Sequence, residues 1–160
     1  MIDRGPETIT AATIPPPPRS MEPGKRPLDV PFDVPGTDVA FFNFGLVALE
    51  AFETALAPAG GLREPLFGII ERQLLAGSPK MVRMALDYGL KTVRDGKAVP
   101  LEIDLDEPPF AIGPAVEAAL NALAISIMGK SYADLIAEAT ADAQARAAEA
   151  RKAWEDSKTA

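Results

Sequence analysis

Apolar residues recur every three or four positions in four central segments of the chain, which is the spacing of one face of a helix. A proline, a glycine or a polar N-cap residue separates each segment from the next, as expected at helix ends. The pattern predicts helices over residues 45–57, 63–76, 79–94 and 114–128. Ser131 predicts the start of a fifth helix, with Asp134 three residues later in a capping-box arrangement,. The fold class we expect is therefore mainly α, a small helical bundle.

A second pattern, alternation of apolar and polar residues, precedes the helices and predicts an N-terminal β-hairpin over residues 28–44,. Its turn is expected at Pro35–Gly36, because proline presets the first turn angle and glycine accepts a positive φ. Pro31 and Pro35 cannot donate to a strand ladder, so the hairpin should form an edge or a two-stranded flap on the helices. The apolar positions of the two strands are Leu28, Val30, Phe32, Val39, Phe41 and Phe42.

Alternation returns at residues 99–106, just before Pro108 and Pro109 interrupt any regular structure,. This segment is either a short strand or an extended linker whose apolar side lies on the helices. Its apolar residues are Val99, Leu101, Ile103 and Leu105, and they alternate with Glu102, Asp104 and Asp106.

The two ends of the chain differ from this centre and divide it into three parts. Residues 1–27 are an extended proline-rich arm, because the run Pro15–Pro18 favours polyproline II over helix,. The arm is either an unstructured tail or a docking arm that lies along a partner. Residues 28–136 are the helical domain with its hairpin. Residues 137–160 are rich in alanine and charge, and predict a C-terminal helix that protrudes because it has little to bury,.

Composition narrows the chemistry open to the chain. Its 160 residues include no histidine and no cysteine, which removes the commonest general base, the commonest metal ligand and the best thiol nucleophile. The net charge of −7 argues against a nucleic-acid binder, which needs a basic patch,. No apolar run is long enough to predict a membrane span. We expect a non-enzymatic protein that uses no cofactor or metal and acts through protein contacts.

Two motifs resemble chemical sites but have simpler explanations. Gly129, Lys130 and Ser131 look like the end of a phosphate-binding loop, but Ala124 stands where that loop needs another glycine,. A helix stop followed by a helix cap explains them better. A dense acidic group would suit a hard cation or a basic partner, although a solvated face is the favoured interpretation. Its members are Glu102, Asp104, Asp106 and Glu107.

The candidate binding residues are aromatic and methionine side chains, which suit adaptable apolar contacts with another polypeptide. Trp154, the only tryptophan, is either an exposed anchor for a partner or folds back onto the bundle. Six further residues are expected to line an apolar groove, although the same side chains would also suit the core: Phe41, Phe42, Phe44, Met81, Met84 and Tyr88.

Several short motifs follow one another between residues 28 and 136: VPFDVPGTDVAFFNFG, LVALEAFETAL, LLAGS, VRMALDYGL and IGPAVEAALNALAISIMGKSYADLI. In their order and small-residue breaks they resemble the tail assembly chaperones of long-tailed phages, and most closely the small helical group encoded with gene transfer agent tails. The pieces that carry the resemblance best are Asn43-Phe44-Gly45 with Leu49 and Glu50, and Tyr88-Gly89-Leu90. The arm and the alanine-rich tail lie outside it.

The resemblance implies a helper of the host-cell cytoplasm that coats the tape measure protein and recruits tail tube protein before the tail polymerises. It brings no catalytic residues, and self-association is expected with it. Two other hypotheses stay open. One is a structural virion protein, such as a minor tail or connector component ordered by its neighbours. The other is an acidic regulator that sequesters a basic partner through residues 102–107.

Overall fold

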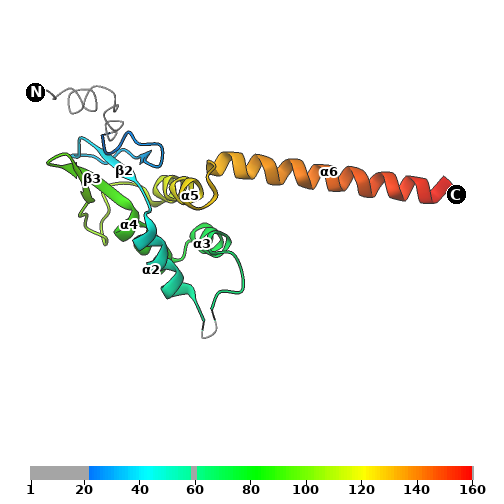
Figure 1. The fold of residues 1–160 in the computed structure, drawn as a ribbon, viewed down its shortest axis with the longest axis horizontal. Coiled ribbons are helices and arrows are strands. Elements are labelled where there is room, and N and C mark those ends of the chain that lie inside the picture. Colours follow the sequence, from blue (N-terminus) through cyan, green and yellow to red (C-terminus); the bar gives the residue numbers. More distant parts are fainter. Residues whose placement is uncertain (1–21, 59–60, 160) are drawn as a thin grey trace, which may run out of the picture.

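The elements of the protein are drawn in Figure 1 from a computed structural model, which describes residues 22–58 and 61–159. Most of the predicted arm, residues 1–21, lies outside the described residues. The described chain is mainly α-helical, as the pattern predicts, with a small antiparallel sheet. In chain order the elements are β1 (Val30–Pro31), β2 (Ala40–Phe42), α2 (Leu46–Leu56), α3 (Leu66–Leu75), α4 (Pro79–Gly89), β3 (Leu90–Arg94), β4 (Lys97–Pro100), α5 (Ile112–Met128) and α6 (Tyr132–Thr159).

Local sequence signals set several of the helix ends. Ser78 caps α4, because its Oγ accepts a hydrogen bond from the Met81 backbone N–H at 3.4 Å,. Gly129 ends α5 with a φ of 73°, a left-handed conformation that glycine adopts at little cost,. Ser131 Oγ accepts a hydrogen bond from the Asp134 backbone N–H at 3.1 Å, at the start of α6. The stop-and-cap interpretation of Gly129 to Ser131 therefore matches the structure.

The β-structure is more extensive than the predicted hairpin. β1 pairs with β2 as expected, with Val30 opposite Phe42, but β2 also pairs with β3, and β3 with β4. The result is one antiparallel sheet in the order β1-β2-β3-β4. Of the two alternatives for the hairpin, the two-stranded flap is wrong and the edge is correct, because β1, which contains Pro31, is an edge strand of this larger sheet.

The third predicted helix, 79–94, is too long. The observed helix ends at Gly89, and the last five residues of the predicted segment, 90–94, form β3. Asp95 and Gly96, which directly follow the predicted helix, both have positive φ, 54° and 75°. Positive φ at both central residues is the geometry of a tight two-residue hairpin turn, for which Asp-Gly is a preferred pair. The same dipeptide therefore turns β3 into β4 instead of ending a helix.

Gly89 joins α4 to the sheet at a point where no side chain fits. Its carbonyl accepts a hydrogen bond from the Asn43 backbone N–H at 2.9 Å. A Cβ built on Gly89 would overlap the ring of Phe44. The absence of a side chain therefore lets α4 pass directly into β3 beside the end of β2.

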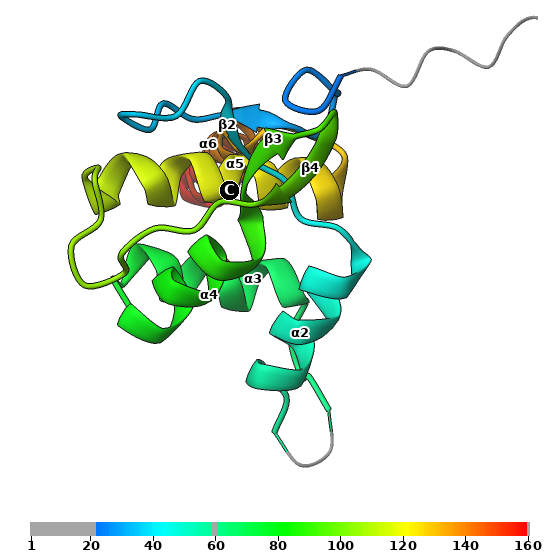
Figure 2. The same ribbon diagram turned by 90° about the vertical axis from the view of Figure 1, so that its left-hand side faces the viewer.

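The core lies between the sheet and the helices that pack beneath it. Figure 2 shows the sheet above α5, with α3 and α4 below it. α5 is the central helix and contacts α3, α4, α6, β1 and β2. Burial of apolar surface between these elements is the dominant favourable contribution to folding. The largest fully buried side chains are Phe41, Phe42, Phe44, Phe52, Ile70, Leu74, Met81, Leu90, Leu120 and Leu123.

Residues 101–111 connect β4 to α5 without helix or strand, and in Figure 2 they run alongside α4. The Leu101 backbone N–H donates to the Leu90 carbonyl at 3.1 Å, which continues the direction of β4. The apolar residues of this segment are half-buried against the core, whereas the acidic ones are exposed. Of the two interpretations of the alternation, the extended linker is correct for residues 101–106, and the strand ends at Pro100.

α6 leaves the body of the molecule and extends away from it (Figure 1). It has 28 residues, which is about 42 Å at 1.5 Å per residue. Every residue from 136 to 159 is exposed against the rest of the described chain. In the parts of the chain that the structure describes, no single helix is long and apolar enough to cross a membrane, and α5 and α6 reach that threshold only together, across a 75° bend.

Candidate functional site

Most of the predicted groove residues lie in the core. Phe41, Phe42, Phe44 and Met81 are buried, so they do not line an accessible surface in this structure. Met84 is half-buried against the core. Tyr88, at 40% exposure, is the member of the predicted set that reaches the surface. The groove as predicted is therefore not formed, and its residues serve mainly to hold the sheet and helices together.

A chain of aromatic contacts explains this burial. Phe42 and Phe44 stack with ring centroids 6.3 Å apart, and Phe44 packs on Phe52 at 5.8 Å. Phe52 in turn lies 6.2 Å from Tyr88. Such pairs add to the free energy of burial through the geometry of their rings. The chain of rings connects β2, α2 and α4, and only its last member, Tyr88, is open to a partner.

A cleft of about 740 Å³ lies on the other side of α4, between that helix, the linker and the start of α5. This volume falls in the range of sites that hold a ligand or a cluster of partner side chains. Seven of its ten lining residues are apolar, but polar atoms contribute nearly as much of the exposed lining, with Arg83 on α4 and two carboxylates on the linker. The lining residues are Gly77, Pro79, Val82, Arg83, Leu86, Ile103, Asp104, Leu105, Asp106 and Ile112.

The linker wall of the cleft is held in place by hydrogen bonds from its own backbone to the Asp104 carboxylate. Asp104 Oδ1 accepts hydrogen bonds from the backbone N–H groups of Asp106, at 2.9 Å, and Glu107, at 3.4 Å. This local turn leaves Ile103 and Leu105 facing the core while the acidic side chains stay exposed. Within residues 22–58 and 61–159, no group of three histidine, cysteine or acidic side chains is arranged to hold a metal ion.

Ile112 closes one end of the cleft and begins α5, and it is 39% exposed. No side chain caps this helix, and its first turn carries no acidic residue. The first backbone N–H groups of a helix carry partial positive charge and favour a negative group. The helix itself therefore tolerates an acidic side chain at position 112.

Sequence analysis missed this cleft, although part of its signal was visible. The alternation at residues 101–105 correctly placed Ile103 and Leu105 on an inner side. The other wall is formed by Val82 and Leu86 on α4, about 20 residues earlier in the chain. Periodicity describes one segment at a time, so it gave no indication that these two walls would face each other.

The base of α6 is anchored to the body by polar and aromatic contacts. The Tyr132 backbone N–H donates to Asn121 Oδ1 on α5 at 2.9 Å, and the Tyr132 ring packs on Phe67 at 6.2 Å. Burial and the neighbouring Glu71 carboxylate raise the pKa of the Tyr132 hydroxyl to about 12. Lys130 Nζ lies 2.6 Å from Glu138 Oε1, and this contact raises the pKa of Lys130. These contacts fix the direction in which α6 leaves the body.

Beyond this base, α6 presents an apolar stripe to solvent. A shallow groove, largely open to solvent, lies along it and is lined by Ile136, Ala139, Thr140, Ala143, Gln144 and Ala147. Trp154 lies further along the helix and is 58% exposed. The ammonium of Lys158 sits 3.8 Å from the centroid of its ring. Of the two interpretations of Trp154, folding back onto the bundle is therefore wrong, and an exposed position is correct.

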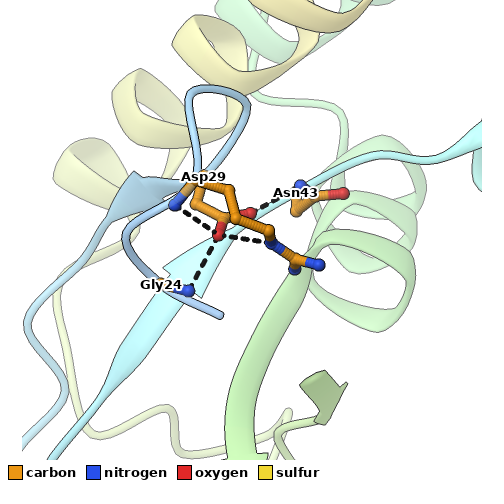
Figure 3. A network of polar contacts seen from close by, with 4 residues as sticks. Gly24, Asp29 and Asn43 are labelled. Carbon is orange, nitrogen blue, oxygen red and sulfur yellow. Dashed lines mark hydrogen bonds and ion pairs between the residues drawn. The ribbon is translucent and has the colours of Figure 1, made fainter. Parts of the chain in front are cut away.

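Asp29 is buried and organises the turn before β1, as Figure 3 shows. Its Oδ2 accepts hydrogen bonds from the backbone N–H groups of Gly24, at 2.8 Å, and Arg26, at 3.1 Å, and from Arg26 Nε at 2.9 Å. Its Oδ1 accepts from Asn43 Nδ2 at 2.6 Å. Burial alone would raise the pKa of Asp29, but these hydrogen bonds outweigh it and lower the pKa below 3.8. The carboxylate is fully engaged, so its role is to hold residues 24–29 against Asn43.

Comparisons of the chain with models of protein families, with curated proteins and with solved structures found no match.

Proposed function

We propose that the protein is a non-enzymatic tail assembly chaperone of a phage or gene transfer agent, which binds the tape measure protein and the tail tube protein in the host-cell cytoplasm. The observation that carries this proposal is the cleft between α4 and residues 101–112, with its row of half-buried apolar side chains. The resemblance of residues 28–136 to that group of chaperones supplies the identity of the partners.

The shape and chemistry of the cleft support a polypeptide ligand. A helical partner docks by inserting apolar side chains from successive turns into a hydrophobic groove. Val82, Ile103 and Leu105 offer such a floor, and they are only half-buried against the body's own core. Arg83 and the linker carboxylates lie beside this floor, where charges fix the orientation of a partner more than they add affinity.

The direct test is co-expression of the chain with the tape measure protein and tail tube protein of the same gene cluster. The proposal predicts that the tape measure protein becomes soluble and copurifies with the chain. Ile112→Glu should abolish copurification, because it places a charge in the cleft. A glutamate in the first turn of α5 is favourable to the helix, so the loss would not come from unfolding.

Leu46→Glu is the matched control, since Leu46 is 84% exposed and lies at the start of α2, away from the cleft. It should copurify like the wild type. Equal loss in both variants, or in neither, would remove the cleft from the proposal. Purified particles provide the second readout: a chaperone is absent from them, whereas a fixed copy number would favour a structural virion component.

A further inference from the structure

We propose that α6 pairs with α6 of a second copy of this chain, in antiparallel orientation, with Trp154 of each copy seated in the groove of the other. This pairing goes beyond the proposed function and does not depend on the partner named above. The occupant follows from four features of α6: its spacing, its groove, its charge and its free length.

The apolar stripe has the spacing of a coiled-coil seam. Its members recur at alternating intervals of four and three residues: Ile136, Thr140, Ala143, Ala147, Ala150 and Trp154. In such a seam each side chain inserts into a hole formed by four residues of the facing helix. Two consecutive holes of this kind are the groove already described, the first formed by residues 136, 139, 140 and 143 and the next by residues 140, 143, 144 and 147.

Antiparallel pairing fills both holes with residues that α6 itself supplies. With Trp154 of one copy in the first hole, Ala150 of the same copy falls in the second. The two-fold axis then lies next to Ala147, and Ala143 of one copy faces Ala150 of the other. Small residues meet around the axis, so the helices approach closely there. The one large aromatic side chain of the stripe enters the hole formed by Ile136, Ala139, Thr140 and Ala143.

The charge of α6 favours the antiparallel over the parallel arrangement. Residues 132–145 carry three acidic residues and no basic one, whereas residues 146–159 carry four basic and three acidic residues. Parallel pairing would set the acidic halves of the two copies beside each other. Antiparallel pairing sets each acidic half beside the half of the other copy that carries the four basic residues and a net charge of +1.

The antiparallel arrangement brings Asp142 level with Arg151 and Lys152. It also brings Glu138 level with Glu155 and Asp156. No acidic residue of α6 lies at the e or g positions that flank this seam,. The preference for the antiparallel orientation therefore comes from the net charges of the two halves and not from ion pairs across the seam.

The length of α6 also fits a pairing of two copies. Its exposed part runs from residue 136 to residue 159, so its midpoint lies beside Ala147, at the two-fold axis that the holes define. The end of each helix then lies level with residues 134–135 of the other copy, at the base of its α6. Because alanine contributes little buried area per residue, the pairing should be reversible.

The purified full-length chain tests the proposal by sedimentation and by the fluorescence of Trp154. We expect a concentration-dependent dimer, and a red shift of the emission on dilution as the indole returns to water. Trp154→Ala should weaken the dimer about tenfold or more, as for a buried aromatic anchor. A chain that stays monomeric at about 1 mM would overturn the pairing, and would leave the proposed function untouched because no other protein is present.

Matched variants locate the seam. Ala147→Glu places a carboxylate at the two-fold axis and should abolish the dimer, whereas Ala148→Glu makes the same change one residue away, outside the stripe, and should change the dissociation constant less than about twofold. Circular dichroism checks that both stay helical. A dimer that survives Ala147→Glu, or equal losses in the two variants, would overturn the seam.

Disulfide trapping decides the orientation. Because the chain has no cysteine, every disulfide that forms must involve an introduced residue. Ala143→Cys and Ala150→Cys should not crosslink when each is oxidised alone, but a mixture of the two should form the mixed disulfide. Efficient crosslinking of each variant with itself would show a parallel dimer and overturn the antiparallel arrangement.

Discussion

Helices α5 and α6 are both rich in alanine, but they have opposite relations to the rest of the chain. In α5 the alanines Ala115, Ala119, Ala122 and Ala124 are buried beside Leu120 and Leu123. In α6 no residue is buried against the described chain. Alanine is the best helix former, so both segments are helical, but it is the larger apolar neighbours that decide whether a helix packs. α5 holds the body together, and α6 is left available to another molecule.

The sharpest way to test this contrast is to truncate one large apolar residue in each helix. Leu123→Ala should lower the free energy of unfolding by about 3 kcal/mol, because it removes buried methyl groups and leaves a cavity. Ile136→Ala, at an exposed position of α6, should change it by less than about 0.5 kcal/mol. Urea unfolding of the dilute protein measures both. A similar loss in the two variants would contradict the contrast.

Gly89→Ala should have the next largest effect, about 2 kcal/mol of destabilisation, because the added methyl group meets the ring of Phe44,. Gly68→Ala is its control: a Cβ there meets nothing within 4 Å, and alanine favours helix α3, in which Gly68 lies,. The control should be neutral or slightly stabilising in the same urea experiment. If both variants behave alike, the junction of α4 and β3 is not as tightly packed as described.

Asp29→Asn should cost about 1 kcal/mol at neutral pH, because it replaces a carboxylate that accepts four hydrogen bonds,. The folded-state pKa of Asp29 is lowered, so the stabilisation by the ionised carboxylate is complete above about pH 5 and is lost as the pH falls through the folded pKa. The difference between wild type and variant should therefore shrink on acidification. Urea midpoints between pH 7 and pH 2.5 check this, and a difference that grows at low pH would contradict it.

Removal of residues 137–160 should have the smallest effect on the body. The anchor residues Tyr132 and Leu135 are kept, and the deleted residues up to 159 are exposed. The melting temperature of the dilute protein should change by less than about 2 °C, while the helical circular dichroism falls by the share of α6. A large drop in melting temperature would mean that α6 packs on the body.

The fold could be predicted from the sequence wherever one segment carried its own signal. Ser78 and Ser131 as helix caps, Gly129 as a helix stop and the pairing of residues 30–31 with residues 41–42 follow from local chemistry. The end of the third helix could not be predicted in this way, because Leu90 and Val93 suit either a helix face or a strand. The dipeptide Asp95–Gly96 is equally suited to ending a helix and to forming a hairpin turn. Only the pairing of residues 90–92 with β2 decides between helix and strand.

The candidate site was less predictable for a related reason. Large apolar side chains suit a binding surface and a core equally well. In the folded chain four of the predicted groove residues are buried in the core: Phe41, Phe42, Phe44 and Met81. The cleft is formed by α4, the linker and the start of α5, which come together only in the folded chain. The sequence left Trp154 open between an exposed anchor and a residue folded back onto the bundle, and its exposure follows only from the direction in which α6 leaves the body.

Amide hydrogen exchange of the full chain, alone and with the tape measure protein, tests most directly that this molecule acts by offering an apolar cleft to another polypeptide. The account predicts that residues 79–89 and 101–113 gain protection from exchange when the partner is added, while the exchange rates of β1 and β2 do not change. Unchanged exchange at residues 101–113, with new protection elsewhere on the body, would contradict it.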